Sequence, residues 1–275
     1  MKALHEVLEF ALHTDPGKVR SNNEDAVFVN PTLGLAILAD GMGGGNAGEV
    51  ASGMATTLLG EDLKKTLAGL ASGNPVGTGG ESRAVGVLRD KIAVVNESIF
   101  RAAEHQPQYA GMGTTLVVTL FQDHRLVAAH IGDSRLYRWR AGELTQLTRD
   151  HSFLQLQLDA GVITPEEAKR SKQKNIVTRA LGIEPKVESE IHEHQVLPGD
   201  LYILCSDGLH DMVEAKDIVA TLGSKRANLE SAARRLIQIA NDNGGKDNVS
   251  VILVKVLEGF LPPKGWWRRF LAWLK

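Results

Sequence analysis

The sequence predicts an α+β fold in which antiparallel β-sheets stack against each other and helices lie outside them. Short apolar segments rich in β-branched and aromatic residues recur along the chain, each bounded by Gly, Asp or Asn, as is typical of strands. These segments form one group before a pair of long helical segments and a second group after it. This order argues against a repeating parallel βαβ sheet.

Eight segments show the strand pattern. They span residues 8–13, 25–30, 33–40, 114–121, 125–131, 135–140, 201–207 and 249–256.

The first long helix is expected to start at Asn46, whose side chain can cap it while Glu49 reaches back, and to run to about Leu67. The second is expected from about Arg83 to His105. Its apolar face comprises Val87, Ile92, Val95, Ile99 and Ala102. Further helices are expected around residues 151–161, 165–172, 216–222 and 228–241, and the Gly-rich segment 69–82 is expected to be a flexible surface loop.

Composition narrows the class of protein. Of 275 residues, 43% are hydrophobic and 23% are charged, which is an ordinary globular balance. The 31 Lys and Arg against 33 Asp and Glu leave no basic excess, so nucleic-acid binding is not expected. One cysteine, Cys205, excludes an intramolecular disulfide and a Cys-based zinc cluster. No apolar run approaches the roughly 20 residues that span a bilayer. We therefore expect a soluble, cytoplasmic protein.

Acidic residues lie at the ends of five expected strands, usually beside Gly. They are Glu24 with Asp25, Asp40, Asp133, Asp207 and Asp247. A single Asp-Gly pair is most often a turn. If these strand ends converge, however, several carboxylates share one site, and packing them without counter-charge costs several kcal/mol per ion. Bound cations are therefore implied. Because the motifs contain only hard oxygen ligands, Mg²⁺ or Mn²⁺ is favoured over zinc or copper.

Arg20 lies four residues before Glu24 in RSNNED. Its guanidinium can bind a phosphate dianion through two parallel hydrogen bonds. The alternative is an exposed arginine on a loop, and this residue alone does not decide between the two.

Taken together, these segments resemble the bacterial metal-dependent serine/threonine protein phosphatases of type 2C, the PPM family. The matching stretches, in the family's order, are RSNNED (20–25), ADGMGG (39–44), GTT (113–115), IGDSRLYR (131–138), LTRDHS (147–152), TRALG (178–182), CSDGL (205–209) and KDNVSVILV (246–254). The resemblance covers residues from about 5 to 256. It implies a four-layer αββα sandwich, two antiparallel β-sheets flanked by helices, with a binuclear metal centre at one end.

The resemblance also implies roles for the acids as metal ligands. Asp40 matches the carboxylate that bridges two metals, and the Gly41 carbonyl matches a ligand of the second metal. Asp207 and Asp247 match the other carboxylates of the first metal. Glu24 matches an acid that serves the second metal directly or through water.

Further residues match a third metal site and a phosphate site. Asp133, with Asp207, matches the site of a third ion seen in bacterial members, and Arg20 matches the phosphate-binding arginine. Residues 152–178 correspond to the flap, a mobile segment beside the site.

The implied function is hydrolysis of phosphoserine and phosphothreonine in proteins by a metal-activated water at a centre of two Mn²⁺ or Mg²⁺ ions. Arg20, Asp40, Asp207 and Asp247 are the implied catalytic residues, and the implied partners are phosphorylated proteins and a cognate serine/threonine kinase. The alternative is a non-catalytic phosphoprotein-binding regulator with the same fold. Such modules usually lose metal carboxylates, whereas this chain keeps them all.

The sequence departs from the family pattern at two positions. Met42 stands where animal members often have a His that can protonate the leaving group, although bacterial members commonly have Met there. Gly45 stands where many bacterial members have a His. His151 could substitute as a proton donor, but a structural histidine that anchors the flap is the favoured interpretation.

Two other motifs fail in context. Residues 43–48 satisfy GxGxxG, but Asp40 just upstream would repel a pyrophosphate, and the position about 20 residues on lies inside the expected helix. A cysteine-dependent phosphatase needs Arg six residues after Cys, and Asp211 stands there. Cys205 is therefore expected in the core.

The chain is expected to divide into a phosphatase domain, residues 1–257, and a basic Trp-rich tail, residues 258–275. Residues 264–275 contain three Trp and four Lys or Arg residues but no acid. This segment suits the anionic inner face of a membrane or a partner protein, and folding back onto the domain is an equal alternative.

Overall fold

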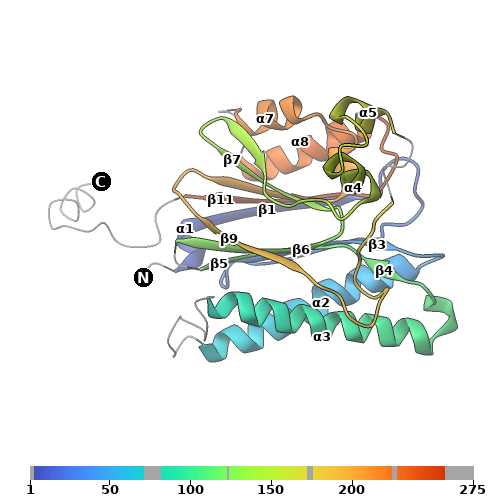
Figure 1. The fold of residues 1–275 in the computed structure, drawn as a ribbon. Helices are drawn as coiled ribbons and strands as arrows, with labels where there is room; N and C mark the ends of the chain where they lie inside the picture. Colours follow the sequence, from blue (N-terminus) through green and yellow to red (C-terminus); the bar gives the residue numbers. More distant parts are fainter. Residues whose placement is uncertain (1–2, 71–81, 123, 172–175, 225–227, 258–275) are drawn as a thin grey trace.

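The computed structural model describes residues 3–70, 82–122, 124–171, 176–224 and 228–257. In this part of the chain two antiparallel sheets lie face to face, and helices cover the outer face of each (Figure 1). The predicted α+β sandwich with helices outside is confirmed.

The first sheet has five strands. Their order is β1 (Leu8–Asp15), β11 (Val249–Val256), β10 (Leu201–Cys205), β7 (Arg135–Arg140) and β8 (Glu143–Gln146). The second sheet has six strands. Its order is β2 (Asp25–Asn30), β3 (Leu35–Met42), β5 (Leu116–Gln122), β6 (Arg125–Ile131) and β9 (Glu190–Gln195), with the short β4 (Gly113–Thr114) paired to β3.

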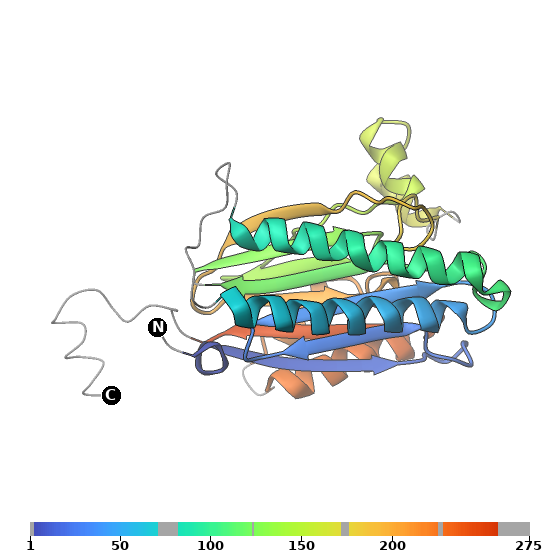
Figure 2. The same ribbon diagram turned by 90° about the horizontal axis from the view of Figure 1, so that it is seen from below.

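Two pairs of helices form the outer layers. The long helices α2 (Ala47–Leu70) and α3 (Arg83–His105) lie side by side under the second sheet (Figure 2). Helices α7 (Ala215–Leu222) and α8 (Leu229–Asp242) pack on the first sheet. The remaining short helices are α1 (Leu4–Val7), η1 (Pro107–Tyr109), α4 (Phe153–Asp159), α5 (Pro165–Arg170) and α6 (Asp207–His210). No helix in the described ranges is both long and apolar enough to cross a bilayer.

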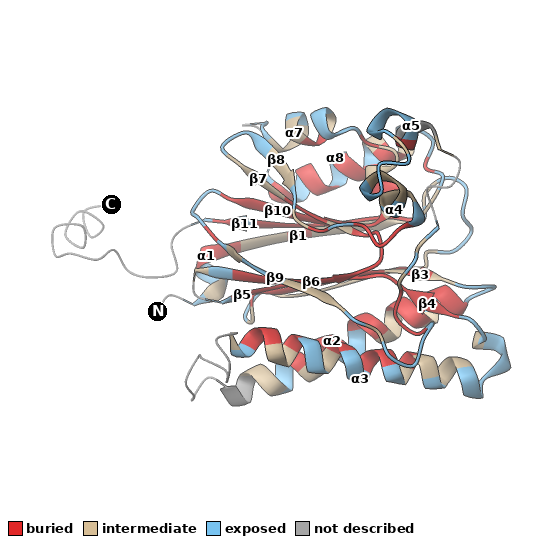
Figure 3. Cartoon of the chain, in the orientation of Figure 1, coloured by how far each residue is buried: buried red, intermediate tan, exposed pale blue. Residues whose placement is uncertain are grey.

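Three clusters of buried apolar residues lie between the layers. Figure 3 shows that buried residues dominate the central strands and occur along the helices. Strand β3 shows why its sequence is continuously apolar rather than alternating: Leu38 faces the other sheet, whereas Leu35 and Ile37 face α2 and α3. A strand buried on both faces needs apolar residues at every position. Between the sheets, Phe121 and Tyr202 pack edge to face with ring centroids 5.3 Å apart.

Several boundaries differ from expectation. Asp40 does not end its strand, because β3 continues to Met42 and pairs there with β4. Strands β8 and β9 were not predicted. Strand β9 has the sequence EIHEHQ with no buried residue and pairs with β6 at the edge of the sheet, so the apolar signal of a strand is absent. The expected loop 69–82 lies largely outside the described residues.

Candidate metal centre

A cavity of about 250 Å³ collects every residue that the sequence assigned to the site. Its lining includes Arg20, Glu24, Asp40, Gly41, Asp133, Asp207 and Asp247. Met42, Gly43, Thr115 and Val177 complete the wall. Residues separated by more than 200 positions in the chain therefore meet in one place, as the prediction of converging acids requires.

Strands and turns of both sheets carry the acids into this cavity. Asp40 lies near the end of β3, where its backbone N–H donates to Thr115 Oγ1 (3.0 Å) and its carbonyl accepts from the Thr115 N–H (2.9 Å). Asp133 lies in the turn after β6, and Asp207 is the first residue of α6, just after β10. Asp247 lies two residues before β11. Each of these acids thus lies within a strand or helix or within two residues of one.

The glycines beside two of these acids permit close backbone contacts. A Cβ at Gly41 would lie 2.1 Å from the Gly48 carbonyl oxygen, and one at Gly208 would lie 2.0 Å from the Asn248 carbonyl oxygen. Any side chain at Gly41 would push α2 away from β3, and any at Gly208 would push α6 away from the segment before β11. The Asp-Gly pairs therefore reflect tertiary packing at the site and not only a turn preference.

Burial makes the clustered carboxylates hard to ionise. It raises the pKa of Asp40, and the neighbouring charges of Asp25 and Asp207 raise it further. Burial and the charge of Asp133 likewise raise the pKa of Asp207. Burial raises the pKa of Asp133 to about 6 and also raises that of Glu24. Bound cations would relieve this repulsion, and a donor set of carboxylate and carbonyl oxygens suits Mg²⁺ or Mn²⁺. The residues present therefore fit the predicted ions.

Asp25 lies beside the cavity, next to Asp40, and sequence reasoning gave it no role. It pairs with Asp40 across β2 and β3 and is buried. Its Oδ2 accepts from Ser206 Oγ at 2.8 Å, whereas its Oδ1 is buried and, among the described residues, has no hydrogen-bond partner. Burial raises the pKa of Asp25. The sequence did contain a signal for a separate role of Asp25. Asp25 follows Glu24 at the start of a strand, and successive side chains of a strand point to opposite faces.

Asn248 was also missed. Its Oδ1 accepts from the Glu24 N–H at 2.8 Å, and its Nδ2 donates to the carbonyls of Pro16 (3.0 Å) and Asn22 (2.8 Å). One amide side chain thus fixes the loop that carries Arg20 and Glu24. The available signal was its position directly after Asp247 in KDN.

Arg20 contacts an acid of the cavity. Its guanidinium donates to Asp247 Oδ2 at 2.8 Å, and this hydrogen bond raises the pKa of Arg20. The Arg20 side chain is 53% exposed, so the pair contributes little to stability and leaves the guanidinium free to turn toward a ligand.

His151 ties the flap to the metal centre. Its Nδ1 accepts from the Gly132 N–H (3.2 Å), its own N–H donates to the Gly132 carbonyl (2.9 Å), and its carbonyl accepts from Thr178 (2.8 Å). Its ring stacks on His130 with centroids 4.7 Å apart. Burial, together with His130, lowers the pKa of His151 to about 4, so it is neutral at pH 7. These contacts agree with the structural role expected for it.

A second cluster of metal-binding residue types contains His130, His151 and Glu190, whose ligand atoms lie within 4.8 Å of one another. His130 Nε2 lies 2.8 Å from the Arg149 carbonyl, to which it donates, and His151 Nδ1 is held by Gly132. Through these hydrogen bonds, both imidazole rings stabilise the loops next to Asp133.

Two further expectations concern the flap and the cysteine. The flap leaves the cavity edge as a loop closed at its base, where the Phe153 N–H donates to the Ile176 carbonyl at 2.8 Å.

Cys205 is fully buried in β10, and burial raises the pKa of its thiol to about 12. The expectation that Cys205 belongs to the core is confirmed.

An αββα sandwich that gathers carboxylates and an arginine in one cavity has the features expected of a metal-dependent phosphohydrolase. Comparison of the chain with known proteins identifies the family. Residues 18–258 match the family model described as Protein phosphatase 2C. The chain belongs to the protein phosphatase 2C family.

Bacterial relatives support this assignment. The chain is 42% identical over 252 residues to serine/threonine protein phosphatase PstP of Mycobacterium tuberculosis, covering 92% of this chain and 46% of the relative. It therefore spans about half the length of that protein. It is 41% identical over 245 residues to serine/threonine phosphatase stp of Listeria welshimeri, covering 88% of this chain and 93% of the relative.

Solved structures agree. The Mycobacterium tuberculosis phosphatase PstP superposes with a TM-score of 0.80 at 41% identity, covering 92% of this chain and 99% of that structure. The catalytic domain of PstP in complex with two manganese ions gives a TM-score of 0.76 at 40% identity, with coverages of 92% and 99%. Stp1 of Staphylococcus aureus gives 0.80 at 36% identity, with coverages of 94% and 98%.

Proposed function

We propose that this chain hydrolyses phosphoserine and phosphothreonine in proteins, using a water activated by divalent cations. The observation that carries the proposal is the convergence of Glu24, Asp40, Asp133, Asp207 and Asp247 with Arg20 in one cavity. An oxygen-only donor set that is costly to ionise without cations is what such chemistry requires.

The family resemblance supplies the roles of the residues that would hold the cations, and their place in one cavity supports them. We propose Asp40 as the bridging ligand, Asp207 and Asp247 as ligands of the first ion, and Gly41 and Glu24 as ligands of the second. Asp133 and Asp207 would hold a third. Mn²⁺ or Mg²⁺ fits this set, and the two manganese ions named for the PstP catalytic domain support manganese. When bound, the cations supply an acidified water and neutralise charge on the phosphoryl group.

The chain's own groups position the substrate. Arg20 would leave Asp247 to bind two phosphoryl oxygens through its guanidinium fork and to stabilise their charge in the transition state. Asn248 would keep Arg20 and Glu24 in place by holding their loop. Asp25, buried beside Asp40, would orient that carboxylate. The thioether of Met42 carries no proton to donate, so the leaving group must take its proton from water or from another residue.

Turnover of phosphopeptides separates this proposal from the alternative of a non-catalytic regulator. The full chain is incubated with matched peptides that contain phosphothreonine, phosphoserine or phosphotyrosine, and phosphate release is measured in Mn²⁺. Release from the first two, lost in Asp40→Asn, is the expected result. Stoichiometric peptide binding without phosphate release would favour the regulator.

We also propose the domain limits and partners that the sequence suggested. Residues 1–257 would form the phosphatase domain, with a flap at 152–178, and a serine/threonine kinase would produce the substrates. Residues 264–275 lie outside the described residues, and from their composition alone we propose contact with an anionic membrane surface or a partner protein.

A further inference from the structure

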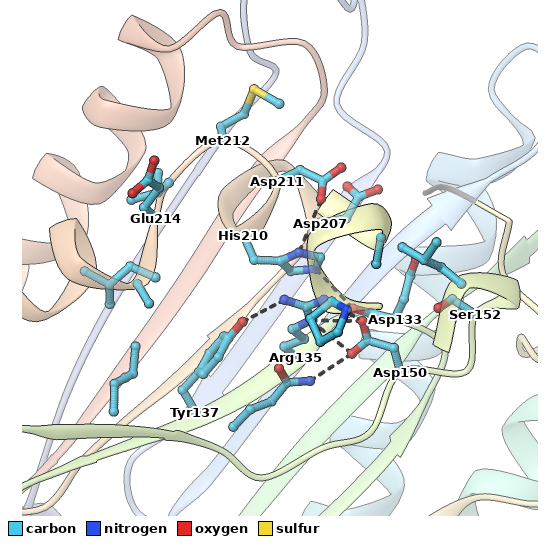
Figure 4. Close-up of a pocket in the computed structure, with 18 of the residues that line it drawn as sticks. Asp133, Arg135, Tyr137, Asp150, Ser152, Asp207, His210, Asp211, Met212 and Glu214 are labelled. Atoms are coloured by element: carbon cyan, nitrogen blue, oxygen red, sulfur yellow. Dashed lines mark hydrogen bonds and ion pairs between the residues drawn. The ribbon is translucent and has the colours of Figure 1, made fainter. Parts of the chain in front are cut away.

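A second, larger hollow of about 920 Å³ lies beside the metal centre (Figure 4). Asp133 and Asp207 line both this hollow and the smaller cavity, so the two are neighbours that share a wall. A molecule whose phosphoryl group enters the small cavity can therefore place its adjacent atoms at the edge of the larger one.

The larger hollow runs between the flap and the helices that follow Asp207. We call it the flap groove and define it by the larger apolar side chains of its lining, which include Leu144, Leu154, Leu158, Pro165, Met212 and Ile218. Helices α4 and α5 supply one wall, α7 and the segment before it supply the other, and β8 lies at the base. The volume falls in the range of pockets that enclose a drug-sized ligand, which is enough for a few peptide residues.

Helix α4 is unusually apolar for a helix with no fully buried residue. Its sequence is FLQLQLD, and none of its residues, all of which the structure describes, is buried. Leu154 and Leu158 are one helical turn apart and face the flap groove, whereas Leu156 is 55% exposed and does not line it. An apolar helix face in water gains free energy when a ligand covers it.

Apart from Asp133 and Asp207, which belong to the metal centre, several charged side chains of the flap groove are paired within it. Arg135 donates three hydrogen bonds to Asp150, the shortest at 2.6 Å, and Lys216 pairs with Glu214 at 2.7 Å. Figure 4 shows Arg135 held between Asp150 and Tyr137. These pairs leave apolar contact as the main means by which the groove can bind a ligand.

We propose that the flap groove binds the segment of the phosphoprotein that flanks the phosphorylated Ser or Thr, and that it selects a large apolar side chain close to that residue. This inference rests on the proposed phosphatase function and adds a substrate preference to it. The shared wall at Asp133 and Asp207 supports a substrate segment as the occupant, because the groove adjoins the cavity in which the proposed hydrolysis would take place.

The test uses phosphothreonine peptides in which Leu or Phe replaces Ala at single positions within three residues of the phosphothreonine. For the wild-type chain in Mn²⁺, at least one such replacement should raise kcat/KM about tenfold, the usual size of a preference for one apolar side chain. Each value is divided by kcat/KM for p-nitrophenyl phosphate, a small substrate that cannot fill the groove.

Two matched variants of α4 locate the effect. Leu158→Gln should remove most of the apolar preference in this ratio, because it makes the groove wall polar. Leu156→Gln, on the other face of the same helix, should keep the preference, and it controls for changes in helix stability. No preference in the wild type, or equal loss in both variants, would overturn the inference. Absence of turnover on every substrate, including p-nitrophenyl phosphate, would instead refute the proposed function.

Discussion

Replacing Asp133 with Asn is predicted to stabilise the metal-free protein at neutral pH. Asp133 is 6% exposed, and burial raises the pKa of its carboxyl from the model-compound value of 3.8 to about 6. A shift of this size costs the folded state about 3 kcal/mol at pH 7, since the unfolded chain ionises the carboxyl freely. Asn carries no charge at any pH, so Asp133→Asn should recover up to about 3 kcal/mol.

The pH dependence of this gain has a definite sign. Between the two pKa values the folded state holds more protons than the unfolded state, so stability falls as pH rises through this window. The gain from Asp133→Asn should therefore shrink from about 3 kcal/mol at pH 7 to roughly half that value at pH 5. Urea denaturation in EDTA, at both pH values, measures it.

Asp200 provides the matched control for this experiment. It is 1% exposed; burial acts to raise its pKa, but hydrogen bonds from Arg140 and the Leu197 N–H lower the pKa overall. Asp200→Asn should therefore destabilise the protein at pH 7. If Asp133→Asn also lowered stability, or gave the same gain at both pH values, the electrostatic reasoning for the cavity would be wrong.

The remaining predictions concern turnover and location. Asp40→Asn and Asp207→Asn should each nearly abolish phosphate release at saturating Mn²⁺ while the fold survives, as circular dichroism would show; near-normal turnover would make the ligand assignment wrong. Arg20→Ala should weaken binding of phosphorylated substrate more than that of Mn²⁺, and Arg20→Lys should restore it only in part, because a point charge lacks the guanidinium fork; kinetics beside metal titration check this, and a loss confined to metal affinity would reassign Arg20. Deleting 264–275 should leave turnover of a small aryl phosphate unchanged and reduce binding to anionic vesicles or a partner protein; a lower unfolding temperature with unchanged binding would place the segment in the domain's own core.

The fold was predictable where local patterns and burial agree. The second long helix was expected from Arg83 to His105 and spans those residues, because its apolar face repeats with helical period and Ser82 caps it by accepting from the Val85 N–H. Strand β9 was not predictable by the same means, because an edge strand with polar side chains carries no apolar signal.

The sequence predicted which residues line the site, but it did not predict which hydrogen bonds hold them there. The acids at strand ends and the family resemblance selected residues that do line one cavity. Which groups support them depends on tertiary contacts between distant segments, such as Asn248 with Glu24 and Ser206 with Asp25. No spacing rule in the sequence encodes a hydrogen bond across more than 180 positions.

The central claim is that the carboxylate cavity binds divalent cations that make it a phosphatase site. The most direct test dialyses the full chain against EDTA, titrates it with Mn²⁺, and follows both Mn²⁺ binding by calorimetry and phosphate release from a phosphothreonine peptide. We predict no release before metal is added and a rise in release that saturates together with Mn²⁺ binding. Full release after rigorous chelation, or saturated binding of Mn²⁺ without any release, would contradict the claim.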